Sequence, residues 1–153
     1  MKAREWSIQT AASVVISIEL EFIGLHVSMG TMKFTGKKVP GDGRGKGLGF
    51  PTLNLSVEEK ERPEEGIYAV KVSFDGRDFK GAMHVGPRPT FEGTSATVEI
   101  HVLDFNEEVA EGTLVEFEVV KKLREVLKFD SVEELVKQIQ LDVEQAKDIM
   151  SAL

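Results

Sequence analysis

The chain has 153 residues, of which 41% are hydrophobic and 29% are charged, as is typical of one soluble globular domain with a single core. Its formal net charge of -7 argues against nucleic acid as a main partner, because binding to phosphate backbones normally goes with a basic excess. The absence of cysteine excludes disulfides, zinc–thiolate sites and cysteine nucleophiles, and a reducing, cytoplasmic location is expected.

Residues 1–32 are expected to form an N-terminal extension of unknown role. Their apolar stretch, residues 11–27, contains Glu19 and Glu21, and it is too short and too charged for a membrane span. A signal peptide would have a cleaner apolar core and a small-residue cleavage site. We therefore expect no membrane partner, and we predict the folded domain at residues 33–153.

From residue 33 onward, short apolar runs alternate with turn signals, which is typical of antiparallel strands. Asp75-Gly76 is a strong hairpin signal between two of these runs. Pro87 and Pro89 are expected to forbid regular pairing after the strand that precedes them. The predicted strands cover residues 33–39, 52–56, 67–74, 79–85, 96–105 and 113–121.

One predicted helix follows the strands. Ser131 is expected to cap it, because Glu134 stands three residues later in a capping-box pattern. The apolar residues that recur at helical spacing predict one face packed on the sheet: Val132, Leu135, Val136, Ile139, Val143, Ala146, Ile149 and Leu153. Short antiparallel strands followed by a helix predict a mainly β fold, a small barrel with the helix across it.

The glycine-rich stretch VPGDGRGKGLGFPTLNL, residues 39–55, is either a mobile loop or a phosphate site. It matches neither the Walker A pattern nor the dinucleotide fingerprint. Its glycines nevertheless allow backbone N–H groups to approach phosphate oxygens, and Arg44 and Lys46 add positive charge. Spacing alone leaves both alternatives open.

Thr52 and Asn54 stand two residues apart, so they share one face of the strand that leaves this loop. A hydroxyl and an amide oxygen side by side are hard ligands of the kind that suit Mg²⁺. The two residue types are also common on exposed strand faces, so the pair by itself does not establish a metal site.

The same stretch resembles the opening motif of the riboflavin kinase (flavokinase) family, G-x-G-R-G-x-x-L-G-x-P-T-x-N. Four more segments resemble motifs of that family, in order: GIYAVKV (66–72), HVGPRPTF (84–91), VEIHVLDF (98–105) and LREVLKFDSVEELVKQIQLDVEQA (123–146). The resemblance covers about residues 33 to 150, and five ordered motifs are far more specific than any one of them. It points in particular to the kinase module of bacterial bifunctional FAD synthetases.

The resemblance implies a six-stranded antiparallel Greek-key β-barrel with a C-terminal α-helix. It also implies ATP-dependent phosphorylation of the riboflavin 5′-hydroxyl to FMN, with Mg²⁺, in a protein that is expected to be a monomer. In many bacteria this module follows a flavin adenylyltransferase domain, for which residues 1–32 are too short. We therefore expect that this chain does not synthesise FAD. It is expected to be either a stand-alone kinase or a module of a larger protein.

The resemblance identifies Glu99 as the catalytic base, since it matches the Glu of the V-E-x-H motif. Strand alternation puts Glu99 and His101 on the face opposite Val98 and Ile100, and Glu99 would accept the 5′-hydroxyl proton. Without the motif, a solvated Glu paired with a cross-strand lysine would explain the residue equally well.

The remaining nucleotide positions follow from the same matches. Thr52 and Asn54 match the P-T-x-N pair, which holds Mg²⁺ and the nucleotide phosphates. Gly41, Arg44 and Lys46 belong to the loop that covers ATP. On the strand of the predicted base, Val102 and Asp104 match positions near the nucleotide base and ribose, although both are also ordinary strand residues.

Arg124 and Phe129 are the predicted flavin-binding residues. A planar guanidinium and an aromatic ring suit an isoalloxazine, although Phe129 would also fit as the residue that packs the start of the helix. His84 and His101 have no third ligand in view; they are predicted to be structural, and no transition-metal site is implied.

Two positions depart from the family pattern. Glu111 stands where the family often has the aromatic residue of L-Y-G, and Glu125 replaces the Pro of L-R-P-E. These changes are expected to affect the affinities for nucleotide and flavin. The alternatives are a flavin- or nucleotide-binding module with little catalytic activity, or a generic barrel whose loop contacts a protein, which the ordered motifs disfavour.

Overall fold

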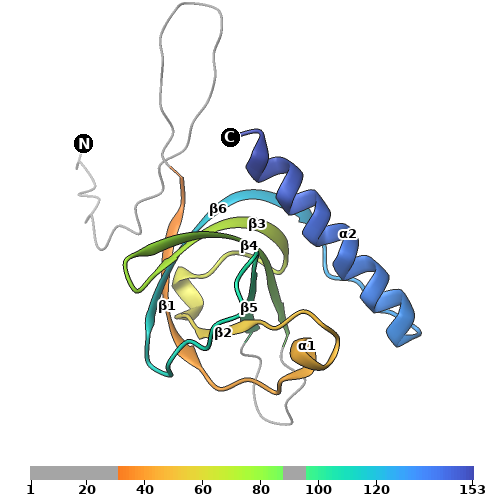
Figure 1. Ribbon diagram of the computed structural model, residues 1–153, viewed down its shortest axis with the longest axis horizontal. Helices are drawn as coiled ribbons and strands as arrows, with labels where there is room; N and C mark the ends of the chain where they lie inside the picture. Colours follow the sequence, from red (N-terminus) through yellow and green to blue (C-terminus); the bar gives the residue numbers. More distant parts are fainter. Residues whose placement is uncertain (1–30, 88–95) are drawn as a thin grey trace, which may run out of the picture.

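The computed structural model describes residues 31–87 and 96–153. Most of the predicted N-terminal extension and part of the HVGPRPTF segment lie outside these residues. The described chain is an antiparallel closed barrel with strand order β1-β2-β5-β4-β3-β6 (Figure 1). Its strands are β1 (Lys33–Val39), β2 (Leu53–Ser56), β3 (Gly66–Phe74), β4 (Arg77–Pro87), β5 (Ala96–Val102) and β6 (Leu114–Arg124).

The strand order confirms the predicted fold class, a six-stranded Greek-key barrel with a C-terminal helix. Strand β2 pairs with β5 instead of its sequence neighbour β3, and β6 pairs with both β3 and β1. The pairing of β6 with β1 closes the barrel, so none of the described strands is left at an open sheet edge.

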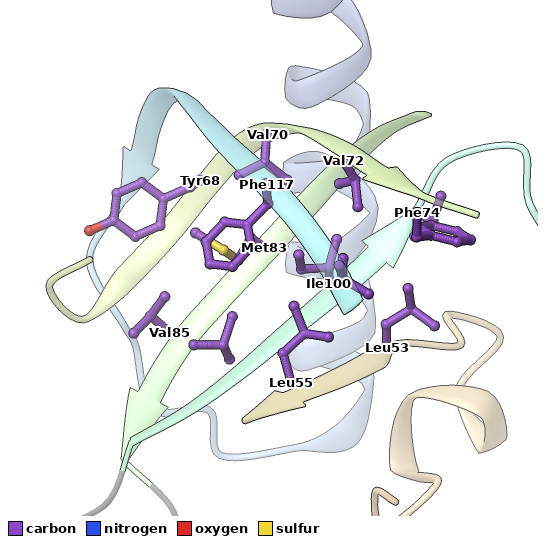
Figure 2. Packing of buried hydrophobic residues seen from close by; sticks show 13 residues of the cluster. Leu53, Leu55, Tyr68, Val70, Val72, Phe74, Met83, Val85, Ile100 and Phe117 are labelled. Atoms are coloured by element: carbon purple, nitrogen blue, oxygen red, sulfur yellow. The ribbon is translucent and has the colours of Figure 1, made fainter. Parts of the chain in front are cut away.

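Alternation along each strand fills the barrel with apolar side chains (Figure 2). Val70, Met83, Ile100 and Phe117 are almost completely buried there. Phe34 of β1 stacks on Phe117 of β6 with ring centroids 5.3 Å apart, at the seam where the barrel closes. The outward-facing residues of the same strands are therefore available for a site on the barrel surface.

The predicted hairpin at Asp75-Gly76 is confirmed. Both residues have positive φ angles, 50° and 71°, and they join β3 directly to β4. Paired left-handed residues match the right-handed twist of the flanking strands, which is why this dipeptide favours a two-residue turn.

Some strand boundaries differ from the predictions. Pro87 was expected to forbid pairing, but it is the last residue of β4 and stands opposite Ala96, because a strand end needs no further N–H donor. Strand β5 ends earlier than expected, at Val102, since Asp104 adopts a left-handed φ of 54°. Strand β6 extends past Lys121 to Arg124 through two irregularities in its pairing with β3.

Helix α2 (Val132–Ser151) packs on the outside of the barrel against β3, β4 and β6 (Figure 1). Ser131 caps it as predicted by accepting a hydrogen bond from Glu134 N at 3.2 Å. Fully buried Ala69 and Ala146 bring helix and barrel close together. At its C-terminal end, Lys80 Nζ donates to Met150 O at 3.1 Å, a favourable position for a cation.

The predicted apolar face of α2 is wrong at both ends. Val132 and Leu153 are exposed, at 58% and 74%; Val132 is the first residue of the helix, and Leu153 lies beyond its last residue, Ser151. Met150 and Asp142 are buried instead. An acidic side chain therefore lies on the packed face of the helix.

Two short helical turns complete the fold: α1 (Arg44–Gly47) in the glycine-rich loop and η1 (Glu59–Glu61) between β2 and β3. The loop is therefore partly regular, with Gly43 in a left-handed conformation (φ 69°) before α1. Among residues 31–87 and 96–153, no helix has the length and apolar character needed to span a membrane.

Candidate active site

Strand pairing brings several polar residues into one row on the outer face of the barrel. Asn54 of β2 is opposite Glu99 of β5, and Glu99 is opposite His84 of β4. His84 is opposite Ile67 of β3, which in turn is opposite Arg124 of β6. Residues that are distant in the sequence thus lie side by side across five strands.

A cavity of about 370 Å³ covers this row. It is bounded by the outer face of the barrel, by the loop that contains α1, and by α2 with the segment that precedes it. The structure brings the following predicted site residues to its lining: Arg44, Thr52, Asn54, Glu99, Arg124 and Phe129. The predicted base is therefore in the same cavity as the predicted metal-binding pair and the predicted flavin-binding pair.

The glycine-rich loop lies directly on β2 and β5. A Cβ atom at Gly41 would overlap the side-chain amide of Asn54, so a larger residue could not occupy this position without displacing the loop. Phe50 N donates to Gly45 O at 2.7 Å and closes the α1 turn. His101 Nδ1–H donates to Pro51 O at 2.9 Å, which ties the end of the loop to β5.

His84 is the neighbour of Glu99 in the row, and its side chain is half-buried. Burial lowers the pKa of His84 below its ordinary value of 6.5, and the nearby Arg124 adds to this effect. The negative charge of Glu99 opposes the shift but does not overcome it. The imidazole beside the predicted base is therefore neutral at neutral pH.

Arg124 and Phe129 meet at the other end of the row. The guanidinium carbon lies 5.9 Å from the ring centroid of Phe129, within range of a cation–π interaction. Arg124 Nη1 donates to Glu125 O at 2.9 Å, while the Glu125 carboxylate accepts from Lys122 Nζ at 2.7 Å. The glutamate that replaces the family's proline is thus held by both its backbone and its side chain.

Four predicted nucleotide-site residues do not line the cavity. Gly41 lies beside the side chain of Asn54, where a Cβ atom would not fit, and Lys46 is exposed on α1. Val102 is 3% exposed because its side chain belongs to the barrel core, and Asp104 is exposed at the turn after β5. Their proposed contacts with nucleotide remain predictions.

Sequence reasoning did not assign His84, His101 or Asp142 to the site, although all three line the cavity. The two histidines were predicted to be only structural, and no sequence signal tells which strand stands opposite His84. Asp142 did carry a signal, since it is an acid three residues after Ile139 on an otherwise apolar helix face.

The cavity offers oxygen ligands for a hard cation. Thr52, directly before β2, and Asn54 of β2 present a hydroxyl and an amide oxygen in the cavity that also contains the carboxylate of Glu99, a donor set of the kind that Mg²⁺ takes. Over the described ranges 31–87 and 96–153, no group of three or more His, Cys, Asp or Glu residues is arranged to hold a metal ion.

Fold and cavity together define a small β-barrel protein with a ligand-sized cavity beneath a glycine-rich loop. The family model of riboflavin kinases (Flavokinase) matches residues 29–150, so the chain belongs to the riboflavin kinase family. This membership confirms the resemblance inferred from the five sequence motifs.

A curated relative, the bifunctional riboflavin kinase/FMN adenylyltransferase of Haemophilus influenzae, is 39% identical over 113 residues. The match covers 73% of this chain and 36% of that protein, so the chain spans little more than a third of the relative's length.

Two solved structures have a similar fold. A crystal structure from Streptococcus pneumoniae, described as a macrolide-efflux protein, is 33% identical with a TM-score of 0.67. The match covers 73% of this chain and 37% of that chain. The riboflavin kinase of Trypanosoma brucei has a TM-score of 0.56 at 24% identity, covering 78% of this chain and 76% of that chain, which supports the fold alone.

Proposed function

We propose that this chain catalyses the transfer of the γ-phosphate of ATP to the 5′-hydroxyl of riboflavin, giving FMN and ADP. The observation that carries the proposal is the position of Glu99 within the row. On one side it pairs with Asn54, which extends from the strand next to the glycine-rich loop. On the other side, past His84, the same cavity reaches Arg124 and Phe129.

The phosphate side of the site is assigned to the loop and β2. Arg44 and the backbone N–H groups of the loop would face the nucleotide phosphates, for which a glycine-rich backbone leaves room. The Thr52 hydroxyl and the Asn54 amide oxygen would hold Mg²⁺, which when bound supplies positive charge against the phosphate oxygens.

Glu99 is assigned the proton transfer. Its carboxylate accepts the 5′-hydroxyl proton as the hydroxyl oxygen forms a bond to the γ-phosphorus. The bond between that phosphorus and the oxygen bridging it to the β-phosphate breaks, and ADP leaves. Neutral His84 beside Glu99 adds no positive charge that would weaken the base.

The flavin is assigned to the other end of the cavity, where Arg124 and Phe129 lie together. An aromatic ring and a planar guanidinium offer stacking surfaces to an isoalloxazine. A monomeric state, a cytoplasmic location and the absence of nucleic-acid or membrane partners stay predictions from the sequence.

The test is FMN formation by the purified chain with ATP, Mg²⁺ and riboflavin, followed by chromatography. Glu99→Gln is expected to lower kcat by at least about a hundredfold, the lower end of typical general-base contributions. Glu116→Gln is the matched control, because Glu116 is an exposed carboxylate on another strand, and its kcat should equal that of the wild type.

Absence of FMN from the wild-type reaction contradicts the proposal. If riboflavin fluorescence is still quenched in that case, the flavin-binding module with little activity is the better description. A Glu99→Gln variant as active as Glu116→Gln would remove the assignment of the base while leaving the reaction itself in place.

A further inference from the structure

Asp142 is a buried acid on the face of α2 that packs against the cavity. It is 5% exposed, and its neighbours in the cavity lining include the apolar side chains of Ile139 and Val143. A carboxylate in such surroundings is costly unless charged or hydrogen-bonding partners compensate it. Its partners therefore indicate why the helix carries an acid here.

Arg124 occupies both oxygens of Asp142. Arg124 Nε donates to Oδ1 at 2.8 Å and Nη2 donates to Oδ2 at 2.7 Å, while Gln138 Nε2 donates to Oδ1 at 3.0 Å. A two-point contact sets the plane of the guanidinium as well as its distance. Gln138 is one turn earlier on α2, so it supports the carboxylate from the same helix.

Stability alone does not account for this pair. Replacing a buried ion pair by apolar residues of similar volume is often neutral or stabilising. The neighbouring helix–barrel contacts of Ala69, Ala146 and Met150 are apolar. A guanidinium held in one orientation at the cavity wall is therefore better explained by what it presents to a ligand.

The remaining N–H donors of Arg124 are available to a ligand. Three of its N–H groups donate to Asp142 and to Glu125 O, and no described residue accepts from the others. In the row, Arg124 is three strand spacings from Glu99, about 14 Å at the usual distance between strands. It is thus remote from the transferred phosphoryl group and suited to the far end of the acceptor.

We propose that Asp142, supported by Gln138, is a positioning residue that orients the Arg124 guanidinium toward the ring end of the riboflavin acceptor. The inference rests on the proposed kinase function and adds a specific role for α2. Asp142 acts through Arg124, so it controls the binding of riboflavin and not the chemical step at Glu99.

The main test is Asp142→Asn, which keeps the side-chain volume and removes the charge and one acceptor. The riboflavin KM should rise about tenfold, the scale of one lost hydrogen bond to a charged group. The kcat should stay within about twofold, as expected for an interaction equally strong in the ground and transition states. Met150→Ala is the control, because it loosens α2 away from Arg124 and should lower thermal stability without changing this KM.

A double-mutant cycle with Arg124→Met tests whether Asp142 acts through Arg124. In the Arg124→Met background, Asp142→Asn should produce no further rise in the riboflavin KM. Equal rises in both backgrounds, an unchanged KM, or a fall in kcat alone would each overturn the proposal. If Asp142→Asn does not fold, Gln138→Leu should raise the same KM by a smaller factor, and an unchanged KM there would overturn it.

Failure of the kinase function is recognised separately, because the wild type would then make no FMN. The same variants are in that case compared by quenching of riboflavin fluorescence. If Asp142→Asn binds riboflavin more weakly than the wild type and Met150→Ala does not, the positioning role is supported even though the chain makes no FMN. Equal dissociation constants for the wild type and Asp142→Asn contradict it.

Discussion

At the scale of single residues, the site depends on outward-facing side chains whose inward neighbours build the core. Leu53 and Ile100 are buried inside the barrel, while Asn54 and Glu99, one residue away on each strand, line the cavity. The site and the core are thus made by the same two strands. A substitution on the outer face should affect binding with little effect on packing.

Thr52→Ala is expected to weaken Mg-nucleotide binding by about tenfold, because it removes one oxygen that would interact with a charged group. Riboflavin affinity should be largely unchanged, since Arg124 and Phe129 are at the other end of the row. Titration calorimetry with each ligand checks this, with Ser56→Ala, an exposed residue at the end of β2, as control. Equal losses for both ligands would contradict the assigned role of Thr52.

His84 should make the protein less stable in acid. Because burial lowers its pKa below 6.5, the unfolded chain takes up a proton at higher pH than the folded chain does. The stabilisation is therefore complete above pH 6.5 and is lost as the pH falls through the lower pKa of the folded state.

The check is thermal unfolding of the wild type and His84→Asn between about pH 7.5 and about pH 5, a range that spans histidine titration. The midpoint of the wild type should fall more steeply than that of the variant. Parallel curves, or a folded-state pKa of His84 at or above 6.5 by NMR titration, would show that burial does not dominate.

At the scale of elements, the glycine-rich loop is held in place by contacts that its sequence pattern does not reveal. Gly41 leaves no room for a Cβ atom beside the Asn54 amide, and His101 donates a hydrogen bond to the carbonyl of Pro51. The loop is thus attached to both strands that contribute the predicted phosphate-side and base residues. The loop can approach Asn54 closely because Gly41 has no side chain.

Gly41→Ala is expected to raise the KM for ATP about tenfold, because the added methyl group overlaps Asn54 and overpacking costs about 1–3 kcal/mol. Gly47→Ala is the matched control: its methyl group would meet nothing within 4 Å, and alanine favours the α1 turn. Steady-state kinetics with ATP as the varied substrate compare the two. The same KM in both variants would argue against a role for this contact.

At the scale of the whole molecule, the pairing of five strands assembles the row, and β1 closes the barrel between β2 and β6. Strand β6 pairs with β3, which puts Arg124 in the row, and it pairs with β1, which closes the barrel. The seam is packed by Phe34 and Phe117. Weakening this seam should reduce the stability of the entire domain.

Phe117→Ala is expected to lower the free energy of unfolding by about 3–5 kcal/mol, because it empties a fully buried position and removes the ring stacked on Phe34. Leu114→Ala on the same strand should change it by less than about 0.5 kcal/mol, since Leu114 is 59% exposed. Urea denaturation measures both. A small loss in Phe117→Ala would mean that the seam is not essential.

Local chemistry made much of this protein predictable from its sequence. The period of two on a strand was enough to put Asn54 and Glu99 on the face opposite the core, because it depends only on backbone geometry, although Thr52 itself stands just before β2. The Asp75-Gly76 turn and the Ser131 cap are likewise short-range effects. The ordered motifs indicated the family, which the match over residues 29–150 confirms.

Tertiary structure alone decided which of these residues meet. That Glu99 stands between Asn54 and His84 depends on pairing between strands far apart in the sequence. That Arg124 is held by Asp142 depends on how α2 docks on the barrel. The register of the strands and the docking of α2 are the arrangement that minimises the free energy of the whole core. No local pattern of residues encodes this total free energy.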